Sequence, residues 1–283
     1  MEMVQTEIIM RKFISLACLA LLLSATVSAQ TFKWHSVPMD GTRTGTSMPG
    51  QTDAAEKLGV VEGNVYHAPN GRDFKGGTAT AAAALMLEAQ ASVSPLKESI
   101  GWCPQKMTAH RPESGLSNMI VDCMVEFTEK ETGRHIDVGL INFGGIRESM
   151  PEGNVELGDI FSMLPFLNYL NIVELKGVDL RRMLLSMSGD VQALSGVRME
   201  ITGGKITSLL VGGERIDNDR IYNLVTVDFL LAGGDGISAA GNAISVYDTK
   251  VLVRDAFLAC LKDFRESGRN IEYPTDGRVK FIR

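Results

Sequence analysis

The chain has 283 residues, a hydrophobic share of 45% and a formal net charge of −6. This hydrophobic share is typical of a globular protein and excludes a disordered one. The acidic balance, without any run of lysine and arginine, argues against a nucleic acid as partner. Any phosphate-bearing ligand must therefore be held by a local site.

Residues 1–29 have the pattern of a secretory signal peptide. Two basic residues precede an apolar run, Phe13 to Leu23, that is too short to span a bilayer, and small residues lead up to Ala29. We expect cleavage after Ala29 and export to the periplasm or the medium. Cys18 offers a lipoprotein alternative, which the residues before it match poorly. No other segment is long and apolar enough to span a membrane.

Residues 30–77 are rich in Gly, Pro, Thr and Asp. This composition favours an extended N-terminal arm with turns and one short helix at Asp53–Leu58. Regular structure is expected from Thr78 onward, and residues 78–283 are assigned to one folded domain.

Helical patterns recur in this domain. The clearest is in residues 113–133, where apolar side chains repeat every three to four residues from Leu116 to Phe127 and Gly133 supplies the stop. Further helices are expected at residues 78–94 (with Pro95 at the end), 156–164, 178–189 and 249–264.

Strand patterns lie between these helices. Residues 135–142 and 169–177 each predict a strand, and a third strand begins at Arg220 and runs into a glycine loop. Gly203-Gly204 and Gly212-Gly213 indicate tight hairpins. Because helices and hairpin-linked strands mix without a regular βα repeat, the fold class is α+β, a mixed β-sheet with packed helices.

Three cysteines follow the signal peptide: Cys103, Cys123 and Cys260. This odd, low number argues against a disulfide scaffold. Cys123 lies in the apolar stripe of the clearest helix, so a buried, inert thiol is expected there.

Motifs that activate water or a nucleophile are absent from the sequence. There is no complete G-x-S-x-G elbow, P-loop or dinucleotide-binding glycine motif. The four histidines are scattered, without H-E-x-x-H spacing, and there is no C-x-x-C, so the sequence indicates no metal site.

Binding residues, in contrast, gather around the stretch INFGGIR. Asn142 brings an amide that donates and accepts, and Gly144-Gly145 lets backbone approach a ligand closely. Arg147 offers a planar fork for a carboxylate, a phosphate or hydroxyl groups. Phe166 follows a proline that limits where its ring can go.

A second group lies in the stretch DFLLAGGDG. Phe229 could stack with Phe166 on the two faces of a planar heteroaromatic ring, and Asp235 could accept hydrogen bonds from sugar hydroxyls. Taken singly, each residue has an ordinary structural explanation, as a core ring, a turn residue or a surface charge.

The two stretches together resemble the signatures of the 5′-nucleotidase C-terminal domain. The first is NFGGIRESMPEGNVELGDIFSMLPFLNYLNIVELKG, the second is YNLVTVDFLLAGGDG, and GLSNMIVDCM is similar to the family's helix near the domain start. The resemblance covers roughly Glu113 to Arg283. It implies that the chain supplies a substrate pocket.

The resemblance assigns a role to each residue. It implies that Phe166 and Phe229 sandwich a nucleobase while Asn142, Arg147 and Asp235 hold the ribose and its surroundings. An arginine just before the NMIVD-type helix also takes part in the family, and Arg111 is the nearest candidate here. Pro112 and Ser114 depart from the family pattern around it, and Phe143 replaces a residue that is commonly small.

The larger departure is the lack of the D-x-H, G-N-H-[DE] and G-H-x-H motifs, by which the family's metallophosphoesterase domain holds two metals. The sequence therefore predicts the nucleotide- or nucleoside-binding half of a split 5′-nucleotidase. No cofactor is expected in this chain, and the divalent metals are expected in a separate partner chain. The alternative is a non-catalytic nucleoside- or nucleotide-binding protein that scavenges its ligand.

Overall fold

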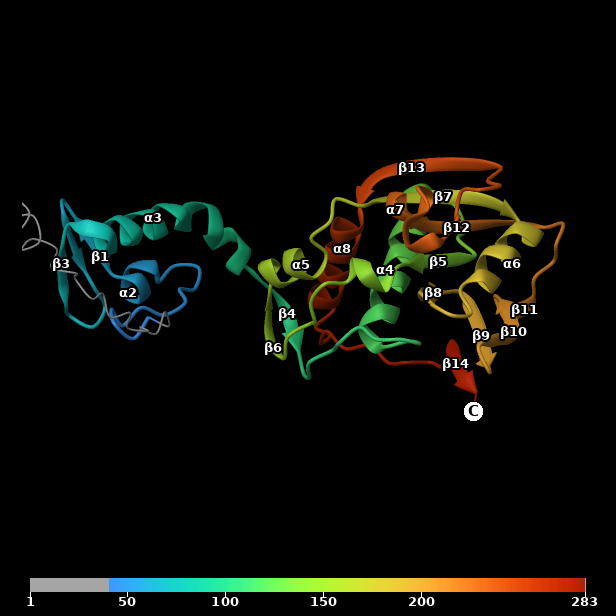
Figure 1. The fold of residues 1–283 in the computed structure, drawn as a ribbon, viewed down its shortest axis with the longest axis horizontal. Coiled ribbons are helices and arrows are strands. Elements are labelled where there is room, and N and C mark those ends of the chain that lie inside the picture. The colour runs from blue at the N-terminus through green and yellow to red at the C-terminus, as the bar shows by residue number, and fades with distance from the viewer. Residues whose placement is uncertain (1–40, 283) are drawn as a thin grey trace, which may run out of the picture.

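The structure is a computed structural model that describes residues 41–282. The predicted signal peptide and residues 30–40 lie outside the described residues. Figure 1 shows a small N-terminal unit, a long helix that leads away from it, and a larger body that holds the remaining elements. Within residues 41–282, none of the helices combines the length and hydropathy needed to cross a membrane.

The N-terminal unit is a small folded structure. It contains helix α2 (Ala54–Leu58), at the place where a short helix was predicted, and a three-stranded antiparallel sheet of β1 (Val60–Glu62), β2 (Val65–His67) and β3 (Asp73–Lys75). Tyr66 is buried at its centre, where the hydroxyl donates to the Leu58 carbonyl at 2.8 Å. The segment expected to be an extended arm thus forms a sheet with its own core.

Helix α3 (Gly77–Val93) packs on this small sheet, which buries Thr80 and Ala83. Much of the rest of the helix is exposed, and a 3₁₀ turn, Ser94–Lys97, follows at Pro95. The predicted domain boundary at residue 77 therefore falls between the small sheet and α3, the helix that packs on this sheet. The composition of residues 30–77 did not show this, because three-residue strands carry almost no periodic signal.

The larger body is built around a five-stranded mixed sheet. Its strand order is β13-β7-β12-β5-β8, and only the β12–β5 pair is parallel. This arrangement confirms the predicted α+β class. The bounds are β5 (Val138–Ile141), β7 (Tyr169–Lys176), β8 (Ala193–Ser195), β12 (Ile221–Val227) and β13 (Ser245–Leu252).

Helices α4 (Gly115–Thr132) and α8 (Val253–Glu266) pack against each other beside this sheet (Figure 1). Ser114 and Ser117 form a capping box at the start of α4, and Gly133 ends it in the left-handed conformation, as predicted. The predicted stripe of α4 is buried, with Phe127 at its partly exposed end.

A disulfide joins Cys123 of α4 to Cys260 of α8. The expectation of a free, inert thiol at Cys123 is therefore wrong. The two helices bring the Cα atoms to 5.8 Å although 137 residues separate the cysteines along the chain, a proximity that spacing cannot reveal. Cys103 is the free cysteine of the described residues, and it is buried.

Two smaller sheets complete the body. One has the order β11-β10-β9-β14 and contains both predicted glycine hairpins, and the other pairs β4 with β6. Short helix α5 links β6 to β7, and short helices α6 and α7 follow β7 and β12 of the five-stranded sheet. Their bounds are β4 (Ser99–Cys103), β6 (Gly153–Glu156), β9 (Val197–Thr202), β10 (Lys205–Val211), β11 (Glu214–Arg215), β14 (Val279–Ile282), α5 (Leu157–Met163), α6 (Gly177–Ser186) and α7 (Asp228–Leu231).

Candidate functional site

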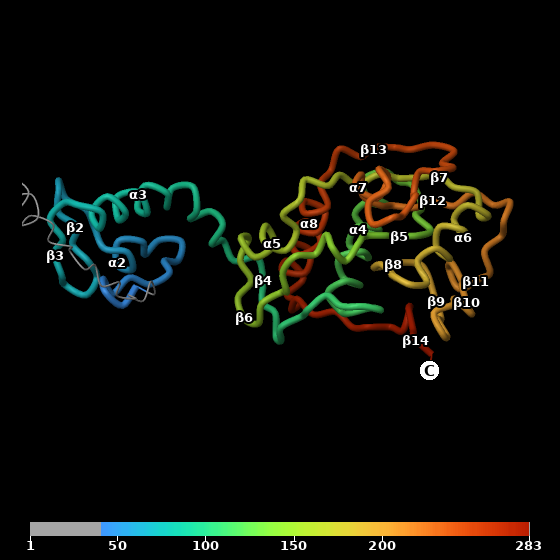
Figure 2. Tube along the Cα trace, in the orientation of Figure 1, coloured from blue at the N-terminus to red at the C-terminus, as the bar shows by residue number. Residues whose placement is uncertain are grey.

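Three loops meet at one edge of the five-stranded sheet. Strands β5 and β12 are parallel, so both end at this edge. Strand β7 is antiparallel to β12, with Leu170 opposite Val227, so β7 begins there. The segments after β5, after β12 and before β7 therefore converge, near the label α7 in Figure 2. The carboxyl ends of sheet strands are a common place for ligands.

Asn142 connects the first two of these loops. Its Nδ2 donates to Asp235 Oδ2 at 2.8 Å, across 93 residues of sequence. The Asn142 side chain is 4% exposed, and its Oδ1 is buried without a hydrogen-bond partner in the protein. Such a group normally finds a partner in protein, water or ligand. The contact brings the two stretches of sequence together at one edge of the sheet.

The glycine pair makes room for this amide. A Cβ atom on Gly144 would lie 3.3 Å from Asn142 Nδ2, and one on Gly145 would lie 3.1 Å from Asn142 Oδ1. Asp235 itself adopts a left-handed conformation, with φ at 52°. The glycine pair and the turn at Asp235 therefore both serve the same amide–carboxylate contact.

Arg147 lies between the first and third loops. Its backbone N–H donates to the Met163 carbonyl at 2.8 Å, its Nη1 donates to the Gly144 carbonyl at 3.3 Å, and its guanidinium lies 6.0 Å from the Phe166 ring centre. No carboxylate of residues 41–282 forms an ion pair with it. The arginine is held at the site with donors left for a ligand.

The two phenylalanines are exposed at the same edge. Phe166 is 48% exposed and Phe229 is 42% exposed. The Phe229 ring lies directly over Gly234, where a Cβ atom would come within 2.3 Å of it. Gly234 of the G-G-D-G stretch thus provides the space that the ring occupies. Exposed apolar side chains that gather at one place, and not singly exposed ones, are a mark of binding surfaces.

Arg111 reaches the site from the other side. Its guanidinium lies 4.9 Å from the Phe143 ring centre, Nε donates to the Val191 carbonyl at 2.9 Å, and Nη2 pairs with Asp190 at 2.7 Å. The structure therefore places Arg111 beside the Asn142–Phe143 turn, despite its unusual sequence neighbours. The bulky Phe143 is the surface on which it stacks.

Gln192 is a site residue that the sequence did not reveal. It is fully buried, and its Oε1 accepts from the Phe143 N–H at 2.9 Å and from Arg111 Nη2 at 3.5 Å. Its Nε2 donates to Asp190 Oδ2 at 2.9 Å. It reaches the site because β8 pairs with β5, with Ala193 opposite Ile141. No motif surrounds it, so only this pairing could have revealed it.

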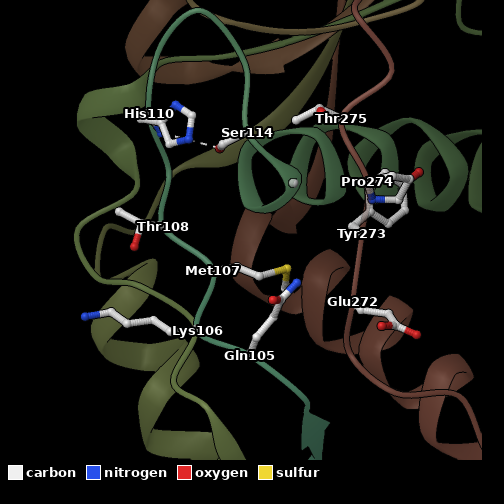
Figure 3. Close-up of a pocket in the computed structure, with 11 residues that line it drawn as sticks. Gln105, Lys106, Met107, Thr108, His110, Ser114, Glu272, Tyr273, Pro274 and Thr275 are labelled. Atoms are coloured by element: carbon white, nitrogen blue, oxygen red, sulfur yellow. Dashed lines mark hydrogen bonds between the residues drawn. The ribbon is translucent and has the colours of Figure 1, made fainter.

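A separate groove of about 650 Å³ lies between residues 105–110 and 272–275 (Figure 3). Lys106 and His110 line one side of it, and Glu272 lines the other. None of the eight predicted site residues lines this groove. It therefore carries mixed charge but none of the proposed nucleotide-binding groups.

The described residues contain no cluster of the kind that binds a metal ion. Across residues 41–282, no group of three or more His, Cys, Asp and Glu side chains is arranged to hold a metal ion. The donor set of the family's metal pair is therefore not found in this part of the chain.

Comparison with known proteins identifies the family. The model of the 5′-nucleotidase C-terminal domain matches residues 91–242. This chain belongs to that family. It is 27% identical over 175 residues to the 5′-nucleotidase of Vibrio cholerae and 28% identical over 195 residues to cell wall protein Lmo0130 of Listeria monocytogenes. These matches cover 53% and 62% of this chain, but 29% and 24% of the relatives.

Solved structures show the same fold. The 5′-nucleotidase precursor of Thermus thermophilus matches with a TM-score of 0.61 at 22% identity, over 77% of this chain and 54% of the enzyme. The NAD nucleotidase of Haemophilus influenzae matches with a TM-score of 0.54 at 18% identity, over 77% of this chain and 47% of that protein. This chain thus spans about half of these solved proteins and under a third of the curated relatives.

Proposed function

We propose that this chain is the nucleotide- or nucleoside-binding half of a split 5′-nucleotidase, a hydrolase of nucleotide catabolism. The observation that carries the proposal is the Asn142–Asp235 hydrogen bond, which joins both signatures at one sheet edge. Arg147, Phe166 and Phe229 surround this contact on the same edge. A site so composed offers polar groups for a sugar and aromatic faces for a base.

Each residue then has a distinct role. Phe166 and Phe229 hold the base between their rings, and Asn142 and Asp235 bind ribose hydroxyls. Arg147 binds the polar side of the sugar with its free donors. A metallophosphoesterase partner would supply divalent metals, which activate the attacking water. This chain contributes by orienting the substrate toward that water.

The open site supports a partner that covers it. A ligand pocket normally buries most of its ligand, whereas both rings here face solvent. Leu167 is 66% exposed beside Phe166, and Tyr169 and Phe161 are exposed on the neighbouring segments. This apolar surface is of the kind that marks a protein interface.

Export to the periplasm or the medium is part of the proposal. The Cys123–Cys260 disulfide supports it, because disulfides persist in oxidising compartments. The name of the Listeria relative, a cell wall protein, is consistent with it. A lipid anchor at Cys18 is the alternative form of export.

Calorimetric titration tests the binding role. The metal-free chain is titrated with adenosine, AMP and UDP-glucose, and the titration is repeated with the Phe166→Ala/Phe229→Ala variant. We expect saturable binding that the variant loses by at least tenfold, since base stacking contributes about 1–3 kcal/mol for each ring. Equal binding by both proteins would contradict the aromatic clamp.

A mixing experiment separates the split enzyme from the alternative, a non-catalytic binding protein. The chain is combined with a metallophosphatase from the same organism, and phosphate release from AMP is measured. A rate above the sum of the separate proteins supports the split enzyme. Tight nucleoside binding without any gain from a partner would favour the scavenging protein.

A further inference from the structure

A second groove lies between α6 and strands β10 and β11. Its lining shares no residue with the candidate nucleotide site. It has a volume of about 310 Å³. Helix α6 follows the carboxyl end of β7, whereas the candidate nucleotide site lies where β7 begins. The lining residues are Arg181, Leu185, Ile206, Thr207, Ser208, Leu209, Leu210 and Arg215.

The guanidinium of Arg181 has few hydrogen-bond acceptors in this groove. Its Nη2 donates to the Ile216 carbonyl, which is its one side-chain hydrogen bond among residues 41–282. Its Nε–H is buried and has no acceptor. A desolvated guanidinium donor without an acceptor is unfavourable, and an anion is the strongest partner it can take.

Arg215 lines the same groove and has no carboxylate partner within the described residues. Two arginines nearby in the sequence behave differently. Arg182 pairs with Asp179 at 2.7 Å, and Arg220 pairs with Asp137 at 2.6 Å. The protein is acidic overall, yet this groove is lined by two arginines that have no carboxylate partner among the described residues. The groove is therefore locally positive.

Neutral donors lie beside these charges. Strand β11 pairs only with Leu210 and Val211, so residues 206–209 of β10 have no strand on the side away from β9. Backbone N–H groups on that side and the hydroxyl of Ser208 are therefore available near the groove, whereas the Thr207 hydroxyl already donates to the Glu200 carbonyl at 3.3 Å. Glu200, opposite Ser208, and Glu214 are the nearest acids on these strands, and neither lines the groove.

We propose that this groove binds a tetrahedral phosphate-type oxyanion, either inorganic phosphate or the head of a phosphomonoester. Such an anion has enough oxygens to accept from Arg181, Arg215 and the β10 edge at once, whereas a carboxylate presents two oxygens in one plane. The leucines of the lining fit the organic part of a monoester. This site does not depend on the proposed nucleotidase function.

The test is a titration of the isotope-labelled chain followed by NMR. Sodium phosphate is added, and sodium chloride at the same ionic strength is the reference. We expect saturable shifts of the Thr207, Ser208 and Leu209 amide signals with phosphate only. Shifts confined to Gly144 and Gly145, or equal shifts with chloride, would overturn the proposal.

Variants make the test specific. Arg215→Gln and Arg181→Gln are each expected to weaken phosphate binding about tenfold or more, the loss typical of a charge-assisted hydrogen bond. Arg182→Gln removes the same charge one residue away and should bind as the wild type does. Arg215 forms no ion pair within the described residues, so Arg215→Gln is expected to fold. Unchanged phosphate binding by Arg215→Gln therefore counts against the site, even if Arg181→Gln fails to fold.

Methyl phosphate identifies the source of the anion. Binding tighter than that of inorganic phosphate, with shifts that extend to the Leu185 amide signal, supports a phosphomonoester. Equal or weaker binding supports free phosphate. Absence of saturable binding for both ligands overturns the site.

Discussion

The amide of Asn142 donates a 2.8 Å hydrogen bond to the carboxylate of Asp235, although the two residues are 93 positions apart. Parallel pairing of β5 with β12 brings their loops together, because parallel neighbours end at the same sheet edge. The donation fixes the orientation of the amide and leaves its Oδ1 buried without a protein partner. Asn142 is therefore held in one orientation beside Asp235.

Asp235→Ala is expected to weaken adenosine binding by about 10–100-fold, because it removes a ribose acceptor and frees the Asn142 amide. Calorimetric titration measures the loss. Asp219→Ala, in the exposed turn before β12, removes an equal charge away from the site and serves as the control. An Asp235→Ala protein with wild-type affinity would show that the contact is structural only.

Gln192→Leu is expected to destabilise the protein by about 1–3 kcal/mol, since the buried Phe143 N–H loses its acceptor. Urea unfolding measures this change. Gln192→Glu keeps an acceptor for Phe143 and Arg111 but places a second carboxylate beside Asp190.

The Gln192→Glu variant should therefore retain the turn at Phe143 better than Gln192→Leu does, and amide shifts of residues 142–145 would show it. If both variants unfold like the wild type and bind adenosine equally well, Gln192 has no positioning role.

The sequence grouped these candidate residues through the resemblance of two stretches to the signatures of one family. One stretch contains Gly144-Gly145, Arg147 and the Pro165-Phe166 pair, and the other contains the glycine loop around Asp235. Gln192 carries no such mark, because its role arises from the pairing of β8 with β5. Long-range pairing is decided by tertiary packing, which single-sequence patterns do not encode.

The same reasoning applies to the fold. The periodic helix at residues 115–132 was predicted closely because its stripe and caps are local signals. Edge strand β13 was missed, since most of its side chains are exposed on both faces and alternation is absent. The Cys123–Cys260 pair was missed because it requires α4 and α8 to pack side by side.

Removal of the disulfide should lower the free energy of unfolding by about 2–5 kcal/mol, because the bond closes a long loop. The Cys123→Ala/Cys260→Ala variant and the reduced wild type are compared by urea unfolding. Cys103→Ala is the matched control, since it leaves the disulfide in place. A reductant that leaves the wild-type transition unchanged would argue that the bond does not stabilise the folded chain.

Cys103 should resist alkylation in the native protein. Burial raises the pKa of its thiol, and its Sγ donates to the Gln105 carbonyl at 3.0 Å. The reactive thiolate is therefore scarce near neutral pH. Iodoacetamide labelling followed by mass spectrometry is expected to be slow in buffer and fast in urea. Rapid native labelling of Cys103 would contradict this placement.

Leu167→Asp is expected to reduce the gain in AMP hydrolysis on mixing with the partner by about tenfold or more, because a buried apolar contact at an interface would be replaced by a charge. Adenosine binding by the variant should remain near the wild-type value, since the side chain points to solvent in the free chain and is 66% exposed. Ile221→Asp, at the opposite end of β12 and also exposed, is the control. If Leu167→Asp gains as much as the wild type on mixing, the partner docks on another face, and the exposed phenylalanines would then need a different explanation.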